Sequence, residues 1–105
     1  MWLLVMFDLP VTTKDARSRA TRFRTFLLRD GYFRLQWSVY ARICNGYERR
    51  DKHLKRLKKS LPPKGSVKAL EVTDRQFSNM MMLVSTEKEK EPPAHLGPTE
   101  QLLLF

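Results

Sequence analysis

An unbroken apolar run near the start of the chain constrains the fold more than any other feature. Residues 2–7 (Trp-Leu-Leu-Val-Met-Phe) are all apolar, and they lead into Asp8 and, two residues later, Pro10. Such a run is typical of a β-strand buried on both faces, because a strand wet on one face alternates apolar with polar residues. Pro10 has no backbone N–H to donate to a ladder, so we expect the strand to end near Asp8. From its position alone, Asp8 is either a functional carboxylate or, more commonly, a cap for the following turn.

The charge of the chain indicates a polyanionic partner. Its 105 residues suffice for one domain, and they carry a net charge of +9 with an isoelectric point near 10.1. Residues 86–105 hold two lysines and four glutamates, a net of −2, so residues 1–85 carry +11. This surplus favours nucleic acid over an anionic membrane.

The cysteine content and the lengths of the apolar runs indicate the compartment. The single cysteine, Cys44, permits no internal disulfide and fits a reducing environment. No apolar run reaches the length of a membrane span, and the first run is too short for a secretion signal. We therefore expect a cytoplasmic protein without membrane association.

A basic helix is predicted to follow the first strand. Thr12 and Asp15 resemble a capping box, and Asp30-Gly31 should end the helix. Four apolar residues recur at helical spacing and should face inward: Ala16, Ala20, Phe23 and Leu27. The helix also carries arginines, whose guanidinium groups suit phosphate: Arg17, Arg19, Arg22, Arg24 and Arg29. A solvated basic face is the alternative interpretation.

Residues 32–44 alternate apolar with polar residues and predict a long strand with a bend or bulge part-way. We expect its apolar side to face the core: Phe33, Leu35, Trp37, Val39, Ala41 and Ile43. The other side would face solvent, an interface or a ligand: Tyr32, Arg34, Gln36, Ser38, Tyr40 and Arg42.

The second half of the domain repeats this alternation of elements. A cationic helix is predicted over residues 47–61, with inward positions Tyr47, Leu54, Leu57 and Leu61. A third strand over 66–73, a turn or short helix over 74–79 and a fourth, all-apolar strand over 80–84 should follow. We assign a ferredoxin-like βαββαβ fold of the α+β class, with two helices on one face of a four-stranded antiparallel sheet.

The uncovered sheet face predicts a homodimer. Residues 2–7 and 80–84 are apolar on both faces, but the two helices cover one face, and a second copy is the simplest cover for the other. We divide the chain into a domain (1–85), a linker (86–100) and an edge strand (101–105). The last four residues are apolar and suit addition to a sheet edge: Leu102, Leu103, Leu104 and Phe105.

Several common sites are missing from the sequence. It contains no Ser-His-Asp set, no glycine-rich phosphate loop and no zinc-ligand spacing. RNA-recognition motifs share this fold, but they stack bases on aromatic residues of the first and third strands. The predicted third strand has no aromatic residue, which argues against that motif.

An ordered set of short motifs resembles the Cas2 family of small CRISPR-associated adaptation proteins. The motifs are Phe7-Asp8-Leu9-Pro10, Phe23-Arg24 with Phe26-Leu27-Leu28 and Gly31, Leu35-Gln36-x-Ser38-Val39-Tyr40-x-Arg42, Leu61-Pro62, Gly65, Val72-Thr73-Asp74-x-Gln76-Phe77 and Gln101-Leu-Leu-Leu-Phe105. The resemblance implies a ferredoxin-like homodimer that sits between two dimers of the spacer integrase and holds double-stranded DNA. For some members it also implies metal-dependent cleavage of RNA or DNA, with Asp8 as the catalytic metal ligand.

The resemblance favours a functional Asp8 over a cap. In a twofold dimer, two Asp8 carboxylates would approach the axis and repel unless they shared a proton or a cation such as Mg²⁺. Nucleic acid would then contact five arginines: Arg17, Arg19, Arg22, Arg24 and Arg42. Three functions stay open: a duplex-binding scaffold, which we favour, a metal-dependent nuclease, and a stand-alone toxin-like ribonuclease on the same fold.

Overall fold

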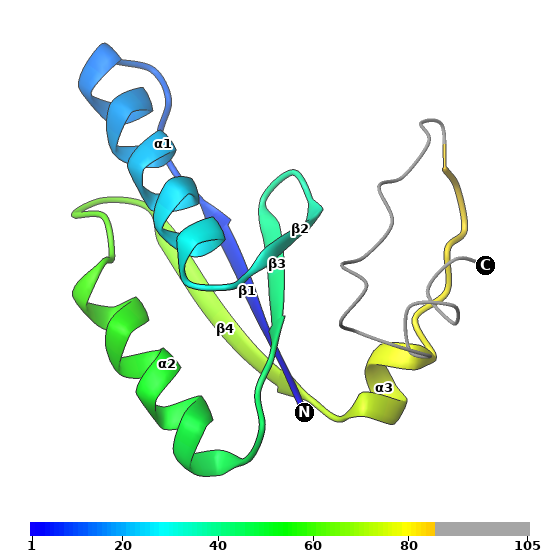
Figure 1. The fold of residues 1–105 in the computed structure, drawn as a ribbon. Coiled ribbons are helices and arrows are strands. Elements are labelled where there is room, and N and C mark those ends of the chain that lie inside the picture. Colours follow the sequence, from blue (N-terminus) through cyan, green and yellow to red (C-terminus); the bar gives the residue numbers. More distant parts are fainter. Residues whose placement is uncertain (86–105) are drawn as a thin grey trace.

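The computed structural model of the protein describes residues 1–85 as a sheet flanked by helices (Figure 1). Its elements, in chain order, are β1 (Trp2–Asp8), α1 (Lys14–Arg29), β2 (Phe33–Gln36), β3 (Val39–Ile43), α2 (Tyr47–Lys59), β4 (Ser66–Val72) and α3 (Asp74–Ser78). The strands lie in the order β2-β3-β1-β4, and every neighbouring pair is antiparallel. This arrangement is consistent with the predicted ferredoxin-like fold. The expected edge strand, residues 101–105, and the linker lie outside the described residues.

The main core lies between the sheet and the helices α1 and α2, which share one side of the sheet in Figure 1. Alternate residues of β1, namely Leu3, Val5 and Phe7, point into it because successive side chains of a strand leave opposite faces. The four apolar positions predicted for α1 are all buried, which confirms the helical spacing. The helix cap differs by one position: the hydroxyl of Thr13, not Thr12, accepts the N–H of Ala16 at 3.0 Å.

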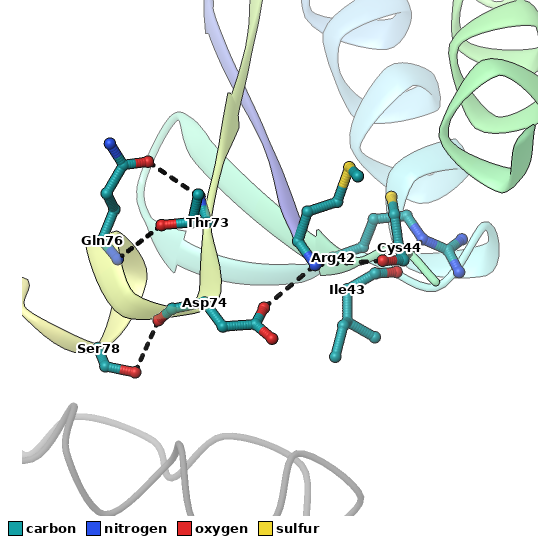
Figure 2. A network of polar contacts seen from close by, with 8 residues as sticks. Arg42, Ile43, Cys44, Thr73, Asp74, Gln76 and Ser78 are labelled. Atoms are coloured by element: carbon teal, nitrogen blue, oxygen red, sulfur yellow. Dashed lines mark hydrogen bonds and ion pairs between the residues drawn. The ribbon is translucent and has the colours of Figure 1, made fainter. Parts of the chain in front are cut away.

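A second, smaller core lies on the other face of the sheet, beneath α3. The indole of Trp2 stacks on the ring of Phe77, with 4.1 Å between centroids and 15° between planes. A capping box holds the start of α3, where Thr73 and Gln76 exchange side-chain and backbone hydrogen bonds (Figure 2). The expectation that helices cover one face alone was therefore wrong, although α3 is short and covers only part of the second face.

Residues 32–44 form a hairpin instead of the single long strand that we predicted. β2 ends at Gln36, β3 begins at Val39, and Trp37 and Ser38 form the turn between them. A bulge between Arg34 and Gln36 shifts the register of the pair. The predicted facing is also corrected. Two residues of the polar set are buried in the main core, Tyr32 and Tyr40, while most of the apolar set packs on the α3 side of the sheet.

The hairpin changes the strand count in the second half of the domain. Because it supplies the second and third strands, residues 66–72 form the fourth strand, β4, at an edge of the sheet. Residues 80–84 form no strand, which corrects the predicted assignment. α2 ends at Lys59, and two of its predicted inward residues, Tyr47 and Leu61, are exposed.

The exclusion of an RNA-recognition motif holds with the corrected third strand. The aromatic residue of β3, Tyr40, is buried on the helix side, and the residues of β3 on the other face are Val39, Ala41 and Ile43. Across residues 1–85, none of the helices combines the length and apolarity needed to cross a membrane.

Candidate functional site at the Asp8 end of the sheet

Asp8 ends the central strand β1 with an exposed side chain. Its backbone pairs with Ser66 of β4, and the preceding Gly65 packs so closely that an added Cβ would lie 2.7 Å from the Asp8 carbonyl oxygen. Within residues 1–85 the Asp8 carboxylate accepts no hydrogen bond and forms no ion pair. Thr13 caps α1, so the structure gives Asp8 no capping role. Its carboxylate is available to an external cation.

A single chain offers few ligands for a metal at Asp8. Among the described residues, no group of three or more His, Cys, Asp or Glu side chains is placed to hold a metal ion. Carboxylate oxygens suit Mg²⁺, which keeps several waters and commonly takes only one or two protein carboxylates. Asp8 fits such an ion chemically, and a second copy of the chain would offer a second Asp8 carboxylate.

The arginines of α1 lie on two different sides of the helix. Arg17 donates from Nη1 to the carbonyl of Val11 at 3.1 Å, and the guanidinium of Arg24 lies 5.6 Å from the centroid of the Phe7 ring. Arg19 and Arg22 lie on the other side, towards the end of α2. None of these four arginines forms an ion pair within the described part of the chain. Their charges are therefore free to contact an anion.

Arg19 and Arg22 line a pocket of about 330 Å³ between α1 and the segment that follows α2. Lys59 adds a third positive charge to its lining. The remaining lining is Phe23, Phe26, Ser60, Leu61, Pro62 and Pro63. The pocket thus combines a cationic rim with an apolar wall.

The structure does not bring Arg42 together with the other predicted nucleic-acid contacts. Arg42 pairs with Leu3, about 17 Å along β1 from Asp8 at the usual rise per residue. Its guanidinium donates to the backbone carbonyls of Asp30 and, at 3.2 Å, Ile43. Arg42 therefore fastens the end of α1 to β3.

Charged groups cluster around Asp30 near Arg42. The Asp30 carboxylate accepts a hydrogen bond from Arg56 Nε at 2.7 Å, and Arg56 also contacts His53. Partial burial, followed by the charges of Arg42 and Arg56, lowers the pKa of His53. Burial is also the largest cause that raises the pKa of Tyr32 to about 12. These contacts join α1, β3 and α2 at the end of the sheet opposite Asp8.

Sequence reasoning missed an exposed tryptophan near Asp8. Trp37 was predicted to face the core, but 70% of its side chain is exposed in the β2–β3 turn. Guanidinium carbons of Arg24 and Arg34 lie 5.2 and 5.7 Å from the centroid of its indole. The signal that could have revealed it is the length of the alternating segment, which is too long for one strand.

Fold and site together define a class: a small, strongly basic α+β protein with one unpaired carboxylate at the end of its central strand. Comparison with known families places the chain within that class. The family model described as CRISPR associated protein Cas2 matches residues 1–80, and the chain belongs to this family.

Sequence similarity to individual relatives extends along the whole chain. The "CRISPR-associated endoribonuclease Cas2" of Acidovorax ebreus is 52% identical over 105 residues, which cover all of both chains. Proteins of the same name from Parvibaculum lavamentivorans and Flavobacterium psychrophilum are 41% and 39% identical over 105 residues, covering 100% and 88% of their own lengths. These similarities confirm the family that the sequence motifs indicated.

Proposed function

We propose that a homodimer of this chain binds double-stranded DNA during CRISPR spacer acquisition, as a scaffold between dimers of the spacer integrase. Membership of the Cas2 family supports a CRISPR-associated role. The observation that carries DNA binding concerns four arginines of α1, none of which has an acidic partner among residues 1–85: Arg17, Arg19, Arg22 and Arg24. Unpaired arginines gain most from phosphate, because no internal ion pair must first be broken.

The placement of these arginines favours binding without regard to base sequence. Arg17 and Arg24 lie on one side of α1, and Arg19 and Arg22 lie on the other with Lys59. Contacts spread over the two sides of one helix suit phosphates of both duplex strands, and phosphate contacts position a duplex without reading its bases. The high net charge adds long-range attraction.

Dimerisation is proposed through the sheet face that carries α3. Leu4 and Met6 of β1 are only partly buried on this face, and Leu70 of β4, which pairs with Leu4, is half exposed. Asp8 follows Leu4 and Met6 in the alternation of β1 and so belongs to the same face. A second copy packed here by a twofold axis would cover the apolar residues and bring two Asp8 carboxylates towards each other.

A second function, metal-dependent cleavage of RNA or DNA, is favoured by the free Asp8 carboxylate and by the word endoribonuclease in the relatives' names. We propose that Asp8 from each protomer holds a Mg²⁺ ion. A divalent ion so held supplies a Lewis acid for a phosphoryl oxygen and lowers the pKa of bound water. The same chemistry would serve a stand-alone toxin-like ribonuclease, which differs from the scaffold in needing no integrase.

The salt dependence of duplex binding tests the scaffold. Each neutralised phosphate contributes about −0.9 to the slope of log affinity against log salt, so one contact removed from both protomers should make the slope shallower by roughly 2. We expect this change for Arg22→Ala with two unrelated duplexes, measured by fluorescence anisotropy at several salt concentrations.

Arg50 provides the matched control for this titration. It belongs to α2 and is already paired with Asp51 and Glu71, so Arg50→Ala should leave the slope unchanged. Unchanged slopes for single alanine substitutions of Arg17, Arg19, Arg22 and Arg24 would remove α1 from the binding surface and contradict the proposal.

A further inference from the structure

We infer that Trp37 is a stacking surface for an unpaired nucleobase, beside the arginines that bind the phosphate of the same strand. This inference rests on the proposed nucleic-acid function and adds to it the side chain that would hold an unpaired base of a single strand or an overhang. Three features carry it: the exposure of the indole, the two guanidinium groups around it, and its place at the Asp8 end of the sheet.

The exposure of Trp37 needs an explanation beyond folding. The chain has two tryptophans, and the other one, Trp2, is 1% exposed and stacked on Phe77. Trp37 lies in a two-residue turn with 70% of its side chain exposed. Its indole contributes little to the buried core, and a large exposed aromatic side chain is suited to contact with a ligand.

The guanidinium groups of Arg24 and Arg34 lie over the indole of Trp37 at cation–π distances, 5.2 and 5.7 Å from the ring centroid. Even with both arginines in place, 70% of the Trp37 side chain stays exposed. Neither arginine has an acidic partner in residues 1–85, and the buried Nε of Arg24 has no hydrogen-bond partner there. An exposed aromatic side chain with two unpaired cations beside it matches a nucleotide, which presents a flat base and an anionic phosphate.

Trp37 lies at the end of the sheet where Asp8 is found. The N–H of Phe7, the residue before Asp8, donates to the carbonyl of Ser38 at 3.0 Å, and Ser38 follows Trp37 directly. The guanidinium of Arg24 is close to both residues, 5.6 Å from the centroid of the Phe7 ring and 5.2 Å from that of the Trp37 indole. A nucleic-acid strand whose base stacks on Trp37 would therefore pass the end of β1 that carries Asp8.

The geometry favours an unpaired base over a base within a duplex. Bases inside a duplex are stacked on their neighbours and present only their edges in the grooves, so their faces are closed to a side chain. A single strand or an overhang presents an open face. Stacking on an aromatic side chain tolerates any base and is compatible with RNA and DNA alike.

Tyr47 at the other end of the sheet provides a matched control. It is 64% exposed, and the guanidinium of Arg50 lies 4.8 Å from the centroid of its ring. That guanidinium is paired with Glu71 and Asp51, so its charge is already compensated. Tyr47 thus reproduces the exposure and the neighbouring arginine, without the free charge and without the proximity to Asp8.

The test compares short oligo-dT and oligo-rU strands with a blunt duplex, using the full-length protein. Base–aromatic stacking predicts that Trp37→Ala weakens binding of one or both strands roughly 5- to 150-fold. Blunt-duplex affinity should stay within about twofold, and Tyr47→Ala should bind all three probes like the wild type. Whichever oligonucleotide, oligo-dT or oligo-rU, loses affinity in Trp37→Ala shows whether the site takes DNA, RNA or both.

Intrinsic fluorescence gives an independent readout that does not depend on affinity. Strand binding should quench the emission of exposed Trp37 in the wild type. The Trp37→Phe variant keeps an aromatic ring but leaves only buried Trp2 as an emitter, so it should bind strands with little quenching. Equal strand affinities for wild type and Trp37→Ala, or equal quenching in Trp37→Phe, would overturn the inference. Salt-dependent duplex binding without strand binding would overturn the inference alone, whereas binding of none of the probes would also overturn the proposed function.

Discussion

Asp8 is the single residue on which proposed cleavage depends, because it supplies the free carboxylate at the end of the central strand. Asp8→Asn keeps the shape of the side chain but removes the charge that would hold a divalent cation. We expect this substitution to abolish Mg²⁺-dependent cleavage and to leave duplex affinity within a few-fold of wild type, since cleavage and phosphate contact use different residues. Cleavage of labelled RNA and DNA, measured beside duplex binding, checks both halves of the prediction.

Asp15 serves as the control for this substitution. It is also an exposed aspartate, but it lies in the first turn of α1 instead of at the sheet end. Asp15→Asn should cleave like the wild type. If highly purified Asp8→Asn retained full cleavage, the activity would belong to other residues or to a contaminant.

For individual residues, the sequence predicted the environment correctly where it follows from the repeat of a helix or the end of a strand. Asp8 ends its strand as expected, because Pro10 limits the ladder, and the four inward residues of α1 follow the helical repeat. The position of Trp37 was not predictable from alternation, because a turn interrupts the period without changing the pattern of residue types.

At the scale of elements, the loop before β4 packs against the end of β1 at Asp8. Gly65 has φ +101°, a conformation that costs other residues roughly 1–3 kcal/mol, and an added Cβ would lie 2.7 Å from the Asp8 carbonyl oxygen. Gly65→Ala should therefore both destabilise the fold and displace the end of β1. We expect a lower midpoint of thermal unfolding together with reduced cleavage activity.

Gly46, before α2, isolates the effect of backbone strain. Its φ is +96°, but an added Cβ meets nothing within 4 Å. Gly46→Ala should have the same backbone strain but no steric clash, so Gly65→Ala should be the less stable variant by at least about 1 kcal/mol. Equal melting temperatures for the two variants would show that the close contact between Gly65 and Asp8 does not affect the stability of the fold.

The prediction of elements failed where local signals were weak. The β2–β3 turn contains Trp37 and Ser38 and lacks the glycine, asparagine or proline that usually marks a hairpin. Residues 80–84 are strongly apolar, but apolarity alone does not provide a strand with a partner edge. Pairing is a property of the whole sheet, which explains why the fold class was predictable while two strand assignments were not.

At the scale of the whole molecule, the proposed dimer depends on the sheet face that α3 leaves partly open. Leu70 is 50% exposed on this face, so a charge there should be tolerated by a monomer and rejected by a buried interface. Leu70→Glu should give a folded monomer, seen by light scattering at micromolar concentration. Val11→Glu is the matched control, because Val11 is also 50% exposed but lies in the loop before α1.

Deletion of residues 101–105 tests whether the C-terminal segment stabilises the proposed dimer. If these residues add to a sheet edge, their deletion should lower the dimer's stability without unfolding the domain. A wild-type protein that scatters as a monomer would contradict the dimer.

The central position of β1 has a consequence for how the chain reaches its fold. β1 leaves the ribosome before both of its partner strands, β3 and β4, and its pairing with β4 brings Trp2 opposite Val72. Closing contacts this distant in sequence costs chain entropy before they stabilise anything, and such topologies fold more slowly than local ones. Until β4 is synthesised, the apolar strand β1 lacks a neighbour on one edge. In the nascent chain, we therefore expect β1 to be the segment most prone to aggregation, although it later forms the centre of the sheet.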